Sequence, residues 1–121
     1  MIPLGQFIDT ELKKDAARVY HERPEGSPQF PYVVYTFPNS IDDEIREDFI
    51  LEVNIWGNSK NTLALEQLAT DISKRLNRVK HVYGTIATHI YKVNQLSVPD
   101  PDTAIRRRQV RFECRTYTIK E

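Results

Sequence analysis

The sequence predicts one α+β domain over residues 1–121, with an antiparallel or mixed β-sheet of about four strands packed against one long and one short helix. Two kinds of pattern carry this prediction. Four stretches are rich in β-branched and aromatic residues or alternate with period two, as strands do. Between the second and third of them lies one long stretch with apolar residues at three- and four-residue steps, as in a helix. The length of 121 residues suits a single domain.

Two helices are expected. The shorter one covers residues 6–14, where Phe7, Ile8 and Leu12 fall at helical spacing. The longer one starts at a cap formed by Asn58 or Ser59 and runs to about Val79. Its apolar stripe consists of Leu65, Leu68, Ala69, Ile72, Leu76 and Val79.

Four strands are expected, over residues 31–37, 48–56, 85–96 and 105–119. A connection over residues 97–103, with two prolines, is predicted to be a loop that joins the last two strands as a hairpin. In the last strand, alternation places Val110, Phe112, Cys114 and Thr116 on the core side. Val19 and Tyr20 fit either a continuation of the first helix or a short extended arm.

Composition narrows the class of protein. Lysine and arginine number 17, aspartate and glutamate number 17, and the formal net charge is zero, which argues against a globally basic nucleic-acid binder. The single cysteine excludes an intramolecular disulfide. No apolar run approaches the roughly 18 residues that span a bilayer, and the N-terminus lacks the features of a signal peptide. We therefore expect a soluble intracellular domain with no membrane contact.

No catalytic motif is recognisable, so we expect a protein that is not an enzyme, with no catalytic, cofactor or metal site. The four glycines are too scattered for a phosphate-binding loop. His21, His81 and His89 show no metal-ligand spacing, and Cys114 has no neighbouring base in the sequence. An enzyme with a pocket of aromatic residues around one histidine is a third, weaker hypothesis. Its residues would be Tyr32, Tyr35, Trp56 and His89.

Charge is segregated along the chain. Five arginines gather in the last predicted strand, at Arg106, Arg107, Arg108, Arg111 and Arg115. Five carboxylates gather before and at the start of the second strand, at Asp42, Asp43, Glu44, Glu47 and Asp48. In a homo-oligomer the acidic stretch of one copy would meet the arginine strand of the next, in a head-to-tail contact that closes into a ring. The alternatives are a solvated sheet surface and a surface facing a polyanion.

Several runs of the chain together resemble a known group of proteins. They are Arg-Val-Tyr at 18–20, Pro-Gln-Phe-Pro-Tyr-Val-Val-Tyr at 28–35, Val-Asn-Ile-Trp-Gly at 53–57 and the leucine-rich helix at 63–76. With these runs the chain, from about residue 5 to residue 119, resembles the tail terminator, tail completion and head–tail joining proteins of tailed bacteriophages and prophages. The motifs are structural rather than catalytic.

The resemblance implies a non-enzymatic structural protein of virion assembly with an α+β fold. Such proteins form a ring, typically a hexamer, on the end of the tail tube. The ring stops tube growth and provides a docking surface for the head connector or neck protein, while DNA passes through the channel without sequence-specific binding. The expected location is the virion, assembled in the cytoplasm of the bacterial host. In this frame the arginine strand lines the lumen or meets the next subunit.

A nucleic-acid-binding module that uses residues 106–115 is the alternative function. It predicts an affinity that falls steeply with salt. Stacking aromatic residues on the same strand face are sparse, because only Tyr117 qualifies.

Overall fold

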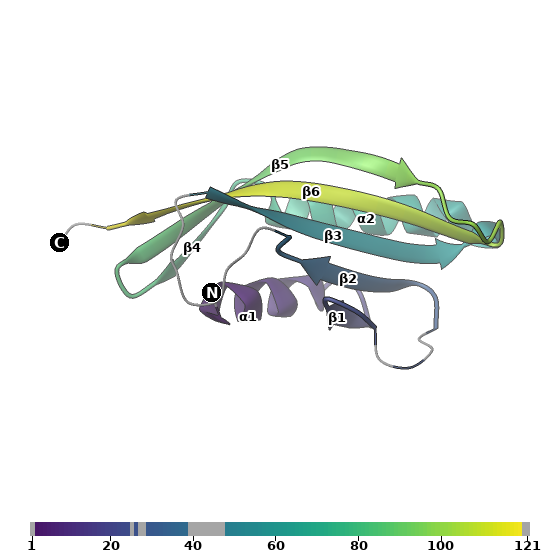
Figure 1. The fold of residues 1–121 in the computed structure, drawn as a ribbon, viewed down its shortest axis with the longest axis horizontal. Helices are drawn as coiled ribbons and strands as arrows, with labels where there is room; N and C mark the ends of the chain where they lie inside the picture. Colours follow the sequence, from purple (N-terminus) through teal and green to yellow (C-terminus); the bar gives the residue numbers. More distant parts are fainter. Residues whose placement is uncertain (1, 25, 27–28, 39–47, 120–121) are drawn as a thin grey trace.

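The structure is a computed structural model that describes residues 2–24, 26, 29–38 and 48–119 (Figure 1). Its elements, in chain order, are α1 (Ile2–Leu12), β1 (Val19–His21), β2 (Tyr32–Thr36), β3 (Asp48–Asn58), the 3-10 helix η1 (Ser59–Asn61), α2 (Thr62–Leu76), β4 (Val79–Tyr83), β5 (Ile86–Val98) and β6 (Ile105–Thr118). The fold is α+β with a mixed sheet, one of the two sheet types that the sequence predicts. The expectation of about four strands is too low, because the described residues form a sheet of six.

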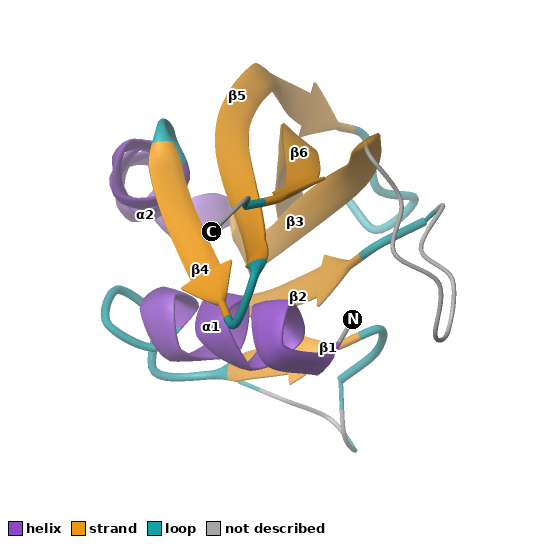
Figure 2. Cartoon of the chain, turned by 90° about the vertical axis from the view of Figure 1, so that its left-hand side faces the viewer, coloured by secondary structure: helices purple, strands orange, loops and turns teal. Residues whose placement is uncertain are grey.

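The strand order in the sheet is β1-β2-β3-β6-β5-β4. Only β1 and β2 run parallel, and every other neighbouring pair is antiparallel. The sheet curls into a half-barrel (Figure 2), and α1 contacts both β1 and β4, the two edge strands, so that it lies across the open side of the curl. Helix α2 runs along the long strands β3, β6 and β5.

One face of the sheet, here called the inner face, carries the hydrophobic core against both helices. Alternation along β3 and β6 determines which side chains reach it. The largest fully buried side chains are Phe112, Leu4, Ile8, Leu12, Leu51, Ile55, Leu65, Ile72, Leu76, Ile90, Val33 and Val53. The core side predicted for β6 is confirmed, since Val110, Phe112, Cys114 and Thr116 are all buried.

The two predicted helices are confirmed with shifted ends. Asn58 caps η1 by accepting from the Lys60 backbone N–H, and Asn61 caps α2 by accepting from that of Ala64. The predicted end near Val79 is wrong. Helix α2 ends at Leu76, because Asn77 takes an extended backbone and Arg78 follows with a positive φ of 65°.

One strand is absent from the prediction, and a second corresponds to one of two alternatives that the sequence left open. Residues 79–83 form β4, which pairs with β5 through a tight turn at Gly84, where φ is +63°. Val19, for which both alternatives were open, begins the extended strand β1 and pairs with Val33. The loop predicted from residue 97 is also corrected, because β5 continues to Val98, whose Cα partner is Arg107 on β6.

Candidate interaction surface

The face of the sheet that no helix covers, here called the open face, carries most of the chemistry predicted from the sequence. Arg107, Arg111 and Arg115 alternate along β6 and point to this face, opposite the buried Phe112 and Cys114. These three arginines therefore share one face of the strand. Arg106 and Arg108 belong to the other side of the strand.

The open-face arginines of β6 are held in a hydrogen-bonded network with β3. Arg111 Nη2 donates to Glu52 Oε1 at 2.7 Å, and Gln109 Nε2 donates to Glu52 Oε2 at 3.0 Å. Asn54 Oδ1 accepts from Arg107 Nη2 at 2.8 Å and from Gln109 Nε2 at 3.0 Å. Asn54 is only 5% exposed, so these bonds satisfy a buried polar side chain.

The antiparallel register of β3 and β6 places carboxylates beside these arginines. Asp48 is the Cα partner of Arg115, and Glu52 is the Cα partner of Arg111. Arg115 Nε also donates to Glu113 Oε1 at 3.0 Å. Three open-face arginines of β6 thus lie beside three carboxylates, at positions 48, 52 and 113, and their formal charges cancel. This part of the surface is polar without being strongly cationic.

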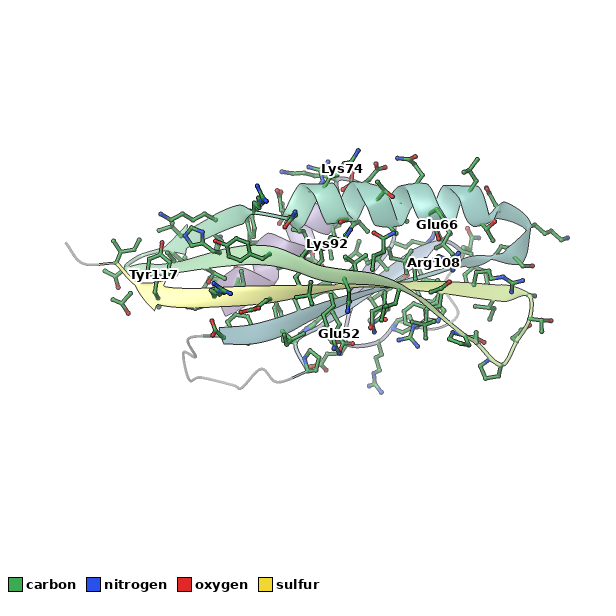
Figure 3. All side chains as sticks on the ribbon, turned by 90° about the horizontal axis from the view of Figure 1, so that it is seen from above. Glu52, Glu66, Lys74, Lys92, Arg108 and Tyr117 are labelled. Atoms are coloured by element: carbon green, nitrogen blue, oxygen red, sulfur yellow. The ribbon has the colours of Figure 1, made fainter. Side chains whose placement is uncertain are left out.

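The remaining two arginines of the strand also have partners. Arg108 forms an ion pair with Glu66 of α2 and thereby ties the helix to the sheet (Figure 3). Arg106 Nη1 donates to the backbone carbonyl oxygens of Thr103 and Ile105. The nearby Asp100 and Asp102 accept backbone N–H groups within the β5–β6 turn, so they act as turn residues.

An aromatic row crosses the open face from β2 to β6. The Phe30 and Tyr32 rings stack with centroids 5.7 Å apart, and the Tyr32 and Trp56 rings stack at 5.2 Å. The Arg107 guanidinium continues the row at 4.7 Å from the Trp56 ring centroid. Burial and the Asp100 charge raise the pKa of Tyr32 above its ordinary value, so this phenol stays protonated at neutral pH. The sequence pattern does not predict this row, because it forms only when β2, β3 and β6 become neighbours in the sheet.

A second aromatic group lies on the open face of β5 and β6. His89 Nε2 and the Tyr117 hydroxyl are 2.8 Å apart, and the His89 ring stacks against both Tyr91 and Tyr117. The Arg115 guanidinium lies 5.5 Å from the Tyr91 ring centroid. Tyr91 and Tyr117 are about 40% exposed, at 38% and 43%. Partly exposed aromatic side chains of this kind are typical of interaction surfaces.

Of the four residues of the hypothetical enzyme pocket, the structure brings only Tyr32 and Trp56 together. Tyr32 and Trp56 lie on the open face, whereas Tyr35 is buried on the inner face, where burial and the neighbouring Asp9 raise its pKa to about 12. His89 lies across the sheet with Tyr117. Cys114 is fully buried, and burial, with the Glu113 charge, raises the pKa of its thiol to about 12. Such a thiol is no nucleophile at neutral pH.

Two kinds of feature are absent from the described part of the chain. No group of three or more histidine, cysteine, aspartate or glutamate side chains there is placed to hold a metal ion. No described helix has the length and apolar character needed to span a membrane. Of the acidic stretch 42–48, the structure describes only Asp48, so the other candidate carboxylates lie outside the described residues.

Comparison with solved structures shows that the fold of this chain occurs in other proteins. The chain resembles a chain from a structure described as the virion of a native gene transfer agent particle, with a TM-score of 0.72, 16% identity and 90% coverage of both chains. It also resembles a solved protein without a descriptive name, with a TM-score of 0.68, 13% identity, and coverage of 93% of this chain and 89% of the other. At these identities the likeness shows a shared α+β fold.

The sequence itself matches the family described as tail completion protein gp17, over residues 9–117. The chain belongs to this family. The resemblance to phage tail proteins expected from the sequence is thereby confirmed, and with it a structural role in the phage tail. No match was found among curated proteins.

Proposed function

We propose that this protein is a non-enzymatic subunit of a homo-oligomeric ring, typically a hexamer, on the end of the phage tail tube. The ring stops growth of the tube, joins the tail to the head connector or neck protein, or does both. It belongs to the virion and assembles in the bacterial cytoplasm, and DNA passes through it without sequence-specific binding. The observation that carries this proposal is the match to the tail completion family over residues 9–117.

The open face supports the proposal because it combines a polar network with two aromatic groups. Glu52, Asn54 and Gln109 fix the arginines in place, and the rigid, partly exposed rings around Trp56 and Tyr91 offer contact area. We propose that this face, with the arginines of β6, lines the lumen or meets a neighbouring subunit. Because its charges are balanced by carboxylates, it does so through directed hydrogen bonds and aromatic contacts.

The ring is tested by native mass spectrometry of the purified chain, alone and with the tail-tube protein of the same phage. We expect one closed oligomer whose mass is a whole multiple of the chain mass and which binds tube ends. A chain that stays monomeric, even with assembled tubes, would contradict the ring.

Deletion of the gene separates the two roles by electron microscopy of the lysate. A capping role predicts tubes of irregular, excessive length. A joining role predicts tails of normal length that are detached from filled heads. Normal, infectious particles would contradict both roles.

The alternative, a nucleic-acid-binding module built on the arginine strand, gains no support from the described contacts. Arg111 and Arg115 each form an ion pair, Arg107 is bonded to Asn54, and Arg108 is paired with Glu66. Cations that already have partners release few counterions from DNA. If the double variant Arg107→Glu plus Arg111→Glu bound DNA more weakly than the wild type in a gel-shift assay, this alternative would be restored.

A further inference from the structure

Four exposed cations gather at the corner where α2 ends and β4 begins, here called the corner patch. They are Lys74, Arg78, Lys80 and Lys92. No described carboxylate lies within the 4.0 Å ion-pair distance of any of them. Among the described residues, the side-chain hydrogen bond formed by these four cations is that of Lys92 Nζ to Gln95 Oε1, at 3.4 Å.

Backbone contacts explain why these positions cluster. Arg78 N donates to the Ile90 carbonyl oxygen at 2.7 Å, which closes β4 onto β5 immediately after the helix. The Lys92 backbone N–H donates to Asn77 Oδ1 at 2.9 Å, which fixes β5 against the C-cap residue of α2. Lys80 is the Cα partner of His89, so its side chain lies on the open face and the patch wraps around the edge of the sheet. Figure 3 shows Lys74 on α2 and Lys92 on the sheet along the same stretch of the molecule.

The other cations in this region are neutralised, which makes the corner patch stand apart. Arg75, next to Lys74, is bonded to both carboxylate oxygens of Asp15. Lys13 is paired with Asp9 on α1. The nearest carboxylate of α2 in sequence, Asp71, accepts a hydrogen bond from Gln67 at 2.9 Å.

Arg78 adds a second observation. Its φ of 65° lies in the left-handed region, at the position after a helix where glycine is the favoured residue. A side chain with a Cβ is strained there. Strained backbone at an exposed position is a reason to look for a function of the side chain, and in Arg78 this side chain adds a charge to the corner patch.

We propose that the corner patch binds a second copy of this chain through its acidic stretch, residues 42–48. Asp48 already lies beside Arg115 in the sheet. The rest of the stretch, residues 42–47, carries four carboxylates and one arginine, Arg46, so its formal charge is −3, opposite in sign to the +4 of the patch. The sequence suggested the arginine strand as the partner of the acidic stretch, but in the sheet that strand already has carboxylates of its own beside it. Because two different surfaces of one chain meet, the contact is head-to-tail and closes into a ring when the rotation allows. This inference rests on the ring of the proposed function.

Paired charge reversals test the contact, with oligomer mass read by sedimentation velocity at low and high salt. Lys74→Glu plus Lys92→Glu reverses the patch, and Asp42→Lys plus Asp43→Lys reverses the acidic stretch. We expect each double variant to weaken association at least about tenfold. The variant with all four changes should recover the ring, because opposite charges again face each other. Lys60→Glu, an exposed cation before the other end of α2, is the control and should leave the ring intact.

A further variant separates binding from folding. Arg78→Gly removes one patch charge and relieves the left-handed strain, so it should raise the melting temperature while weakening association. If association were lost because the variant misfolds, its melting temperature would fall as well.

The possible failures are distinguishable. A wild-type chain that never oligomerises overturns the ring itself. A wild-type ring that tolerates reversal of the patch, or four changes that fail to restore it, overturns only the assignment of the patch. Duplex DNA binding that disappears on reversal of the patch while the ring persists also overturns the assignment, in favour of phosphate as the ligand.

Discussion

Replacement of Glu52 by glutamine tests whether the open-face network is structural. The Glu52 side chain is 17% exposed and accepts from Arg111 at 2.7 Å and from Gln109 at 3.0 Å. The neutral amide of glutamine keeps the shape and loses the charge. It can still accept from one neighbour, but it offers a single oxygen where the carboxylate offers two.

The expected cost follows from these contacts. Hydrogen bonds to charged groups contribute about 1.5–3 kcal/mol when buried. Because the Arg111 side chain is 42% exposed, water recovers part of this loss. We therefore expect Glu52→Gln to lower the free energy of unfolding by about 1–2 kcal/mol. With about 2.1 cal/mol/K of unfolding entropy per residue, the melting temperature of a chain of this length should fall by roughly 4–8 °C.

The assay is thermal unfolding followed by far-ultraviolet circular dichroism, with Glu113→Gln as the matched control. Glu113 lies on the same face, but its partner Arg115 is 62% exposed, so the control should cost clearly less stability than Glu52→Gln. A double-mutant cycle with Arg111→Met should show coupling to Glu52 and none to Glu113. Equal effects of the two glutamine substitutions, or zero coupling, would refute the network as a source of stability.

Three other properties can be checked on the purified chain. Cys114 should resist a thiol reagent at neutral pH until the chain unfolds, because its side chain is fully buried and its thiol pKa is raised to about 12. Rapid labelling of the native chain would contradict the placement of Cys114 in the core. His81 stacks on Phe7 with ring centroids 4.6 Å apart, and burial lowers its pKa below 6.5, so the unfolded chain binds this proton first. The contribution of His81 to the free energy of unfolding should therefore be complete above pH 6.5 and fall below that pH by at most about 1.4 kcal/mol per pH unit. Urea unfolding of the wild type and of His81→Phe should accordingly show a different pH dependence only below pH 6.5. Asn61→Ala should cost about 1 kcal/mol by removing the cap of α2, and a change within error in urea unfolding would contradict the capping role.

The long elements could be predicted because their patterns are local. Alternation over β6 placed Phe112 and Cys114 on the core side, and both are buried. The apolar stripe of α2 was likewise visible as three- and four-residue steps. These patterns persist because one face of each element is buried against the same core.

Strand β4 could not be predicted for a physical reason. Val79 falls three residues after Leu76, so it continues the helical stripe in sequence. What ends the helix is the left-handed backbone of Arg78, and arginine gives no signal for that conformation. A glycine at this position would have indicated the boundary.

The charge balance of the open face depends on which strands are neighbours. In sequence, Asp48 and Glu52 lie far from the arginines, and the two groups read as opposite patches. In the sheet β3 pairs with β6, so Glu52 lies beside Arg111 and Asp48 beside Arg115. That adjacency is a property of the topology. Because of it, the arginine strand has carboxylates beside it, whereas the cations of the corner patch form no ion pair with a described carboxylate.

The position of the chain in the particle tests the central claim most directly. An epitope tag at the C-terminus, labelled with gold on purified particles, can be located by electron microscopy. A tail completion protein that caps or joins the tube predicts label at the head-proximal end of the tail. Label spread along the tube, or particles that carry no label although the tagged chain supports infection, would contradict the account.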